Sequence, residues 1–186
     1  MPPKVKVTRE NIIDAAVAIV RRSGAQAINA RTVASALNCS TQPIFSNFAS
    51  MEELGMAVVE QADKICSRYI QQEVESGKYP TYKASGMAYI RFAKEETELF
   101  KLLYMRDRRG EKDPEHHELT ENMNKLVQSN TGLSDNNSKL FHLEMWAYVH
   151  GIATMAATNF IELDWDLVSR MLTDAYLGMR KQYAVE

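Results

Sequence analysis

Apolar residues recur at helical spacing along almost the whole chain, and this pattern constrains the fold more than any other feature of the sequence. A helix repeats about every 3.6 residues, so side chains three and four positions apart share a face. One face of the first predicted helix collects Ile12, Ile13, Ala16, Ile19 and Val20. The alternating residues 5–7 are too few for a strand. The sequence therefore predicts an all-α fold.

Capping residues and helix breakers divide this pattern into about nine helices. The expected N-caps of the first four helices are Thr8, Asn29, Ser40 and Ser50. The first helix is expected to stop near Ser23-Gly24, and Ser50 is spaced from Glu53 as in a capping box. The third helix is expected over about 41–48, and the later ones over about 82–95, 98–106, 114–129, 135–160 and 164–183.

The composition is that of a globular protein. The 186 residues are 45% hydrophobic and 25% charged. No run approaches the roughly 18 apolar residues of a membrane helix, and the N-terminal residues lack the apolar core of a signal peptide. Two cysteines, Cys39 and Cys66, are too few for a disulfide scaffold or a four-thiolate zinc site. We therefore expect a cytoplasmic protein without a membrane partner.

The net charge of −2 hides an uneven distribution. Residues 1–50 contain six basic and two acidic side chains, which gives +4, whereas residues 51–186 contain 16 basic and 22 acidic ones, which gives −6. Such asymmetry is typical of a nucleic-acid-binding end attached to another domain. A solvated basic face gives the same count, so the charge alone does not decide.

Residues 30–48, ARTVASALNCSTQPIFSNF, fit a helix-turn-helix. Ala34 supplies the small side chain where the two helices cross, and Asn38 tolerates the positive φ that the turn requires. Ile44 then packs back against the crossing. A plain amphipathic helix pair is the alternative. Charge and motif together predict a three-helix DNA-binding domain over 1–50 and a larger helical domain over 51–186.

The second helix of this motif would present polar side chains to a DNA major groove. Gln42 can bond to adenine, and Arg31 to guanine or to a phosphate. Ser40 and Thr41 can bind phosphate oxygens, and the basic residues among the first nine can reach the DNA as an arm. The predicted DNA-binding residues are Lys4, Lys6, Arg9, Arg31, Ser40, Thr41, Gln42, Pro43, Phe45 and Asn47.

Over about 60 residues, from the first helix through GAQAINARTVASALNCSTQPIFSNFASMEELGMAVVEQ, the sequence resembles the TetR family of transcription regulators. It keeps the alanine of the second helix, the serine of the turn, the aromatic pair Phe45 and Phe48, and the Glu-Glu-Leu that opens the fourth helix. The resemblance implies a homodimer that holds two recognition helices one DNA turn apart on a palindrome. It also implies a small-molecule effector that shifts the fourth helix.

Two positions depart from the family pattern. Phe45 stands where the family usually has a Tyr whose hydroxyl contacts a phosphate, and Met51 where it usually has a phosphate-binding Lys. Asn47 occupies a frequent His position and can still hydrogen-bond to DNA. The loss of one hydroxyl and one cation predicts modest affinity for the operator and a shallow salt dependence.

Residues 51–186 resemble the variable ligand-binding and dimerisation domain of the family. The string WAYVHG at 146–151 is similar to the Trp-His-Gly motif of one C-terminal subtype. The final helix carries a wide apolar stripe that a dimer would cover, with ordinary burial inside one subunit as the alternative. The residues of this stripe are Trp165, Val168, Leu172, Ala175, Tyr176 and Met179.

The second domain is also rich in methionine, since nine of the ten methionines follow residue 50. Unbranched thioethers adapt to irregular ligands, so the domain is expected to hold a pocket for a small apolar or amphipathic effector. Simple core packing is the alternative for each candidate. The candidates are Phe92, Phe100, Tyr104, Met123, Trp146, His150 and Met155.

The sequence contains no nucleophile elbow, no phosphate-binding glycine loop and no metal motif, so we expect neither a cofactor nor an enzyme. It predicts instead a ligand-responsive, homodimeric DNA-binding repressor. Two alternatives stay open. One is a helical small-molecule-binding protein or enzyme that has lost sequence-specific DNA binding, and the other is a dimerising scaffold without a ligand.

Replacing Met51 with lysine restores the cation that the family pattern has at this position. Met51→Lys is expected to raise the affinity for the operator and to steepen the log–log salt dependence by about 0.9 for each added phosphate contact. A salt titration of operator binding measures both quantities. Affinity and slope that both equal those of the wild type would refute the expectation.

Overall fold

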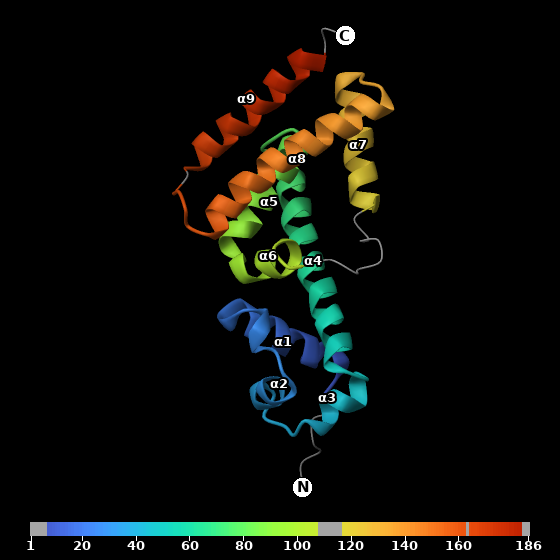
Figure 1. Ribbon diagram of the computed structural model, residues 1–186, viewed down its shortest axis with the longest axis vertical. Coiled ribbons are helices and arrows are strands. Elements are labelled where there is room, and N and C mark those ends of the chain that lie inside the picture. The colour runs from blue at the N-terminus through green and yellow to red at the C-terminus, as the bar shows by residue number, and fades with distance from the viewer. Residues whose placement is uncertain (1–6, 108–116, 163, 184–186) are drawn as a thin grey trace. The chain divides into compact units, whose positions relative to one another are not determined.

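The computed structural model describes residues 7–107, 117–162 and 164–183. Over these ranges the chain forms nine α-helices, one short 3-10 helix and no strand, which confirms the all-α fold (Figure 1). The helices are α1 (Arg9–Ser23), η1 (Ala25–Ala27), α2 (Ala30–Ala36), α3 (Gln42–Asn47), α4 (Met51–Glu75), α5 (Thr81–Glu95), α6 (Thr97–Tyr104), α7 (His117–Thr131), α8 (Asp135–Ala157) and α9 (Trp165–Tyr183).

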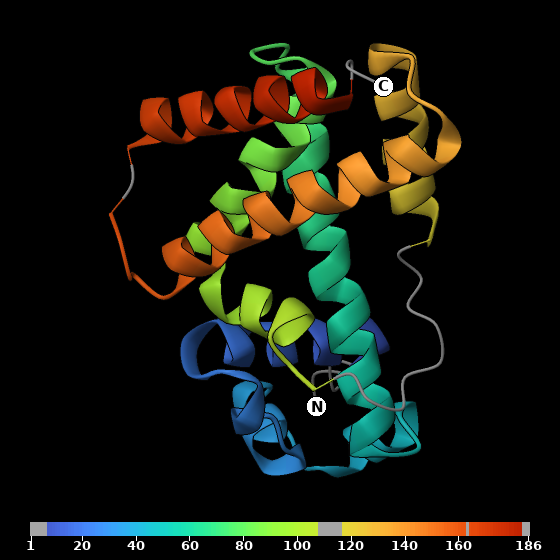
Figure 2. The same ribbon diagram turned by 45° about the horizontal axis from the view of Figure 1, so that its top comes forward.

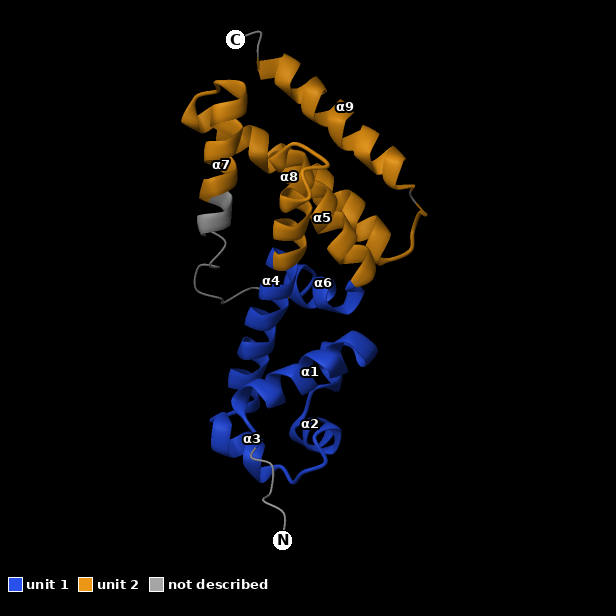
Figure 3. Cartoon of the chain, turned by 180° about the vertical axis from the view of Figure 1, so that it is seen from behind, with its two compact units in different colours: residues 1–67, 96–106 blue, residues 68–95, 107–186 orange. Residues whose placement is uncertain are grey.

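The chain divides into two compact units (Figure 3). Unit 1 comprises Met1–Ser67 and Glu96–Arg106, and unit 2 comprises Arg68–Glu95 and Asp107–Glu186. The division falls inside α4, so this helix belongs to unit 1 at its start and to unit 2 at its end. The functional boundary expected after residue 50 lies at the start of α4 and stays a prediction.

The ends of the first two helices follow from their capping residues. The Thr8 hydroxyl accepts a hydrogen bond from the Asn11 backbone N–H at 3.2 Å, and the Asn11 side chain accepts one from the Thr8 N–H at 3.2 Å. At the other end of α1, Gly24 adopts φ +78°, a conformation that glycine reaches without steric cost. Asn29 caps α2 through bonds from two backbone N–H groups. The expected caps Thr8 and Asn29 are therefore confirmed.

The cap of α3 differs from the prediction. The N-cap is Thr41 rather than Ser40, and no side chain bonds to the helix end. Pro43 is the second residue of α3 and has no backbone N–H for a cap to bind. The next N–H, of Ile44, already donates to the Thr41 carbonyl at 3.1 Å. A side-chain cap would therefore find few donors.

The end of α8 also differs from the prediction. The helix stops at Ala157 instead of residue 160, and Asn159 two residues later adopts φ +50°. A left-handed residue of this kind commonly ends a helix, because it turns the chain away from the helix axis. The early stop lengthens the connection between α8 and α9.

Unit 1 is held together by packing around α1. Helices α2, α3 and α6 each contact α1. Leu99 and Phe100 of α6 have no exposed surface. Beside them the Arg21 guanidinium donates to both oxygens of Glu96, at 2.8 Å from Nε and 2.6 Å from Nη2. This bidentate pair joins the start of α6 to the end of α1.

Unit 2 is built on the packing of α5 against α8 (Figure 2). Two hydrogen bonds of 2.9 Å cross this contact, one between the Tyr82 hydroxyl and His142 Nδ1 and one between the Tyr89 hydroxyl and His150 Nδ1. Burial lowers the pKa of both histidines, so the neutral imidazoles take part in these bonds near pH 7.

Helix α9 packs on the same pair of helices through a glycine. A Cβ at Gly86 of α5 would lie 3.3 Å from Leu172 Cδ1 and 3.5 Å from Val149 Cγ2, so the missing side chain lets α9 approach closely. Toward the other end of α9, Val127, Phe141 and Met145 form a buried cluster. The half-buried residues around this cluster are Tyr82, Leu133, Ala175, Tyr176, Met179 and Tyr183.

Candidate functional site

The turn between α2 and α3 has the conformation that a helix-turn-helix needs. Asn38 adopts φ +51°, as expected from the sequence. The Asn38 N–H donates to the Ser35 carbonyl at 3.1 Å, and the Cys39 N–H donates to the Ala34 carbonyl at 3.0 Å. These bonds close the end of α2 and direct the chain into α3.

The two helices of the motif bury one side and expose the other. Val33, Ala34 and Ile44 are at most 4% exposed, which places the small Ala34 in the interior as predicted. The outer side carries exposed side chains at Arg31, Ser40, Gln42, Phe45 and Ser46. Phe45 is 53% exposed, an unusual position for a large apolar ring unless a partner covers it. The exposed side therefore offers one cation, several hydrogen-bonding groups and one aromatic ring.

Arg9 fixes the end of α3 to the starts of α1 and α4. Its Nη1 donates to the Asn47 carbonyl at 2.6 Å, and its Nη2 lies 2.9 Å from Glu53 Oε1. The guanidinium also lies 4.0 Å from the centre of the Phe48 ring, a cation–π geometry. One side chain of α1 thus holds the last residue of α3, the following aromatic ring and the first turn of α4.

Glu53 completes this arrangement on the side of α4. Its Oε2 accepts a hydrogen bond from the Ala49 N–H at 2.7 Å, and its own N–H donates to the Ser50 hydroxyl at 3.2 Å. The expected capping box thus forms, except that the carboxylate binds the N–H of Ala49 instead of that of Ser50. The bond from the Ala49 N–H and, after it, the Arg9 guanidinium lower the pKa of Glu53, so both interactions favour the charged carboxylate.

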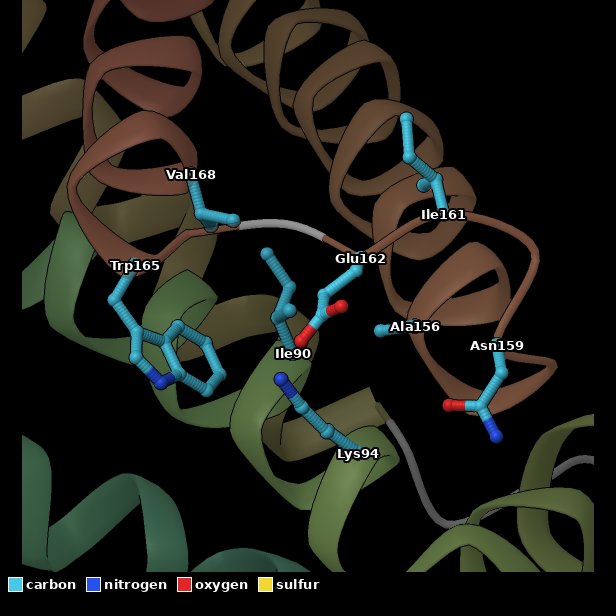
Figure 4. Close-up of a pocket in the computed structure, with 8 residues that line it drawn as sticks. All are labelled: Ile90, Lys94, Ala156, Asn159, Ile161, Glu162, Trp165 and Val168. Carbon is cyan, nitrogen blue, oxygen red and sulfur yellow. The ribbon is translucent and has the colours of Figure 1, made fainter.

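Unit 2 contains a cavity of about 320 Å³ between the end of α5, the end of α8 and the start of α9 (Figure 4). Ile90 and Lys94 reach it from α5, and Trp165 and Val168 from α9. The other lining residues come from α8 and the connection that follows it; they are Ala156, Asn159, Ile161 and Glu162.

The sequence from α5 to α9 decides the family. Residues 82–176, just over half of the chain, match the family described as tetracyclin repressor-like, C-terminal domain. The chain belongs to the tetracyclin repressor-like (TetR) family. No curated protein matches the sequence.

Solved structures of TetR-like proteins share the fold. A TetR-family member from Streptomyces coelicolor A3 has 21% identity and a TM-score of 0.66, over 90% of this chain and 96% of that one. A TetR-like transcriptional regulator from Rhodococcus sp. RHA1 has 16% identity and a TM-score of 0.69, over 95% and 96%. The multidrug binding protein EbrR, solved with imidazole, has 20% identity and a TM-score of 0.63, over 90% and 88%.

Of the three basic residues predicted to form a DNA-binding arm, only Arg9 belongs to the part of the chain that the structure describes. Lys4 and Lys6 lie outside the described residues. Arg9 is the first residue of α1, and its guanidinium binds other side chains and the backbone of unit 1, so it is not part of a mobile arm. Asn47 is half-buried, and its amide donates to the Pro43 carbonyl at 2.7 Å. Thr41 and Pro43 are also half-buried.

The seven predicted ligand-binding residues do not come together at the cavity, and none of them lines it. Phe100 and Tyr104 belong to unit 1, where the Tyr104 hydroxyl lies 3.6 Å from the Cys66 sulfur. Burial raises the pKa of this thiol to about 12, so Cys66 is a poor nucleophile.

The other five candidates belong to unit 2 and occupy different environments. Phe92 has no exposed surface, and Met123 accepts a weak hydrogen bond from Ser85 at 3.8 Å. Trp146 stacks on His150 with 4.9 Å between the ring centres, and Met155 is half-buried in α8. Their role in ligand binding stays a prediction.

Four of the residues that line the cavity follow no helical stripe in the sequence. Lys94 lies in the last turn of α5, and Asn159, Ile161 and Glu162 lie in a connection, so they are not part of the aromatic and methionine pattern that predicted the pocket. The signal that was available is Asn159 itself, a residue type that tolerates the left-handed conformation in which α8 ends. Trp165 and Val168, assigned above to a dimer interface, line the cavity.

The apolar stripe of α9 packs inside its own subunit. Val168 and Leu172 are 1% and 3% exposed, and Ala175, Tyr176 and Met179 pack on the buried cluster of α7 and α8. This placement agrees with ordinary burial, the alternative that the sequence left open. The large apolar side chains that α8 and α9 do expose are Leu140, Leu143, Trp146, Leu167 and Leu177.

The described residues contain no group of three or more His, Cys, Asp or Glu side chains that could hold a metal ion. In the same part of the chain no helix is both long and apolar enough to cross a bilayer.

Proposed function

We propose that this TetR-family protein is a ligand-responsive transcription repressor that binds a palindromic operator as a homodimer. The observation that carries the proposal is the helix-turn-helix of unit 1, in which a left-handed Asn38 connects two helices whose outer side is polar and cationic. A unit of this geometry enters a major groove with its second helix. We further propose that the protein acts in the cytoplasm and has no catalytic activity.

In this proposal α3 reads bases and its surroundings bind the DNA backbone. Gln42 is exposed on the first turn of α3 and can bond bidentately to an adenine edge. Phe45 lies one turn later with half of its surface free, which suits contact with a thymine methyl group. Arg31 and Ser40, also exposed, are suited to phosphate oxygens.

The chain passes between the two units three times, and two of these connections lead to the proposed DNA readers. The helix α4 ends in unit 2 and begins in unit 1, where Glu53 and Arg9 attach it to the end of α3. The segment from α5 to α6 enters unit 1 at Glu96, which the Arg21 guanidinium binds. A ligand that prefers one position of these segments would shift the population of DNA-competent dimers.

The effector is proposed to be a small apolar or amphipathic molecule bound by unit 2. Its cavity has the volume of a small-ligand site, since such sites span roughly 300–1,000 Å³. The fold neighbour EbrR is described as a multidrug binding protein and was solved with imidazole, which is consistent with a small-molecule site on this fold. Membership of the Trp-His-Gly subtype stays part of the proposal, supported by the stacked Trp146 and His150 rings.

The dimer is proposed to form through the exposed apolar side chains of α8 and α9. Leu140, Leu143 and Trp146 follow one another at three-residue spacing on α8, and their exposed fractions are 48%, 58% and 43%. Leu167 and Leu177 are 44% and 48% exposed on α9. A monomer would leave this apolar surface in water, and a symmetric copy would cover it.

Leu143→Glu should convert the dimer into a monomer, because it places a charge at the most exposed apolar position of α8. The mass measured by light scattering is expected to fall from twice 21.1 kDa to 21.1 kDa. Met56→Glu replaces a side chain with 61% exposure on α4 and should leave the mass unchanged. A wild-type protein that is already monomeric, or a variant that stays dimeric, would contradict the proposed interface.

Selection of random duplexes by the purified protein tests the DNA-binding proposal. The wild type is expected to enrich a palindrome, and Gln42→Ala should lose about 1–3 kcal/mol of discrimination at one base pair of each half-site. Gln72→Ala, which removes an exposed glutamine of α4 in unit 2, is the matched control and should select the wild-type motif.

Two results of this selection would count against the proposal. If no palindrome is enriched at low salt, the protein is a binding protein or enzyme that has lost DNA recognition. If Gln42→Ala selects the wild-type motif unchanged, Gln42 is not one of the base readers.

A further inference from the structure

The cavity of unit 2 has an apolar floor. Ile90 and Val168 are each 1% exposed, so their buried side chains form its inner surface, and Ala156 adds a methyl group from α8. Trp165, the first residue of α9, provides an aromatic wall beside them. This part of the cavity is suited to a flat or branched apolar body rather than to a charged group.

The rim of the same cavity carries both signs of charge. Lys94 reaches it from the last turn of α5, and Glu162 reaches it from the connection between α8 and α9 (Figure 4). The Lys94 ammonium lies 5.5 Å from the centre of the Trp165 ring, so the cation is held beside the apolar wall. Asn159 adds an amide that can both donate and accept hydrogen bonds.

A ligand with a single charge would meet one like charge at this rim. A carboxylate attracted to Lys94 would be repelled by Glu162, and an ammonium attracted to Glu162 would be repelled by Lys94. A head group with both charges offers an opposite charge to each of the two side chains. We propose that the effector is a small zwitterion of the α-amino-acid type, whose carboxylate meets Lys94, whose ammonium meets Glu162 and whose apolar side chain lies on Ile90, Val168 and Trp165.

The position of Lys94 in the chain also connects this ligand to regulation, and this step rests on the proposed function. Lys94 lies two residues before Glu96, where the chain enters unit 1 and where Arg21 of α1 binds it. A ligand that holds Lys94 at the rim therefore restrains the segment that leads directly into the packing of α6 on α1. Binding at the cavity can thus change the free energy of the DNA-competent state.

Three compounds with the same indole body and different head groups test the charge of the ligand. L-tryptophan carries both charges, indole-3-propanoate lacks the ammonium, and tryptamine lacks the carboxylate. Isothermal titration calorimetry on the full-length protein measures their affinities. L-tryptophan is expected to bind roughly three- to tenfold more tightly than either of the other two, because only it satisfies both rim charges.

Neutral variants of the two rim residues should reverse this order. Glu162→Gln removes the anion and is expected to make indole-3-propanoate bind at least as well as L-tryptophan. Lys94→Gln removes the cation and is expected to make tryptamine bind at least as well as L-tryptophan. Lys125→Gln replaces an exposed lysine of α7 that does not line the cavity and should keep the wild-type order. Circular dichroism of each variant confirms that it is folded.

The inference is overturned if none of the three compounds binds at millimolar concentration. It is also overturned if a singly charged compound binds the wild type most tightly, or if both neutral variants keep the wild-type order. None of these outcomes involves DNA, so each is distinguishable from a failure of the proposed function, which is the absence of an enriched palindrome.

Discussion

The position of α3, the proposed recognition helix, depends on one guanidinium. The helix has only six residues, too few to be stable in isolation, and no side chain caps its start. Arg9 binds the carbonyl at its end, covers the Phe48 ring that follows and pairs with Glu53 of α4. The left-handed Asn38 sets the direction of the chain before α3, and Arg9 holds the chain at the end of α3. A short helix can thus present its exposed side chains, the proposed base readers, in a defined orientation.

The same arrangement couples α3 to the rest of the chain. The carboxylate of Glu53 binds Arg9 with one oxygen and the Ala49 N–H with the other, so a movement of the first turn of α4 must move the segment that follows α3. In unit 2 the helices α5, α8 and α9 pack closely at Gly86, and ends of the same three helices surround the cavity. Of the three chain segments that pass between the units, α4 is anchored in unit 1 by Arg9 at its start, and the segment from α5 to α6 is anchored there by Arg21 at Glu96.

Local sequence signals predicted those parts of the structure that local interactions determine. Thr8, Asn29 and Asn38 act through bonds to residues within five positions, and the structure confirms all three. Local signals could not predict which side chains are buried by helices that are distant in the sequence. The sequence of the α9 stripe is equally compatible with a dimer interface and with a core. The burial of Val168 and Leu172 against distant helices places these two residues inside the subunit. Arg9 was assigned to a mobile DNA-binding arm by its charge, but it lies in α1 and binds Asn47 and Glu53, which are 38 and 44 residues away. Its contact with DNA stays a prediction.

A double-mutant cycle between Arg9 and Glu53, measured as affinity for the selected palindrome, tests this account most directly. If Arg9 and Glu53 hold the end of α3 as one linked arrangement, Arg9→Ala and Glu53→Ala each weaken DNA binding. The double variant then binds little worse than the single variant with the lower affinity. If Arg9 instead contacts a phosphate, its removal costs the same affinity whether or not Glu53 is present. Additive effects, or an Arg9→Ala variant that binds as tightly as the wild type, would contradict the account.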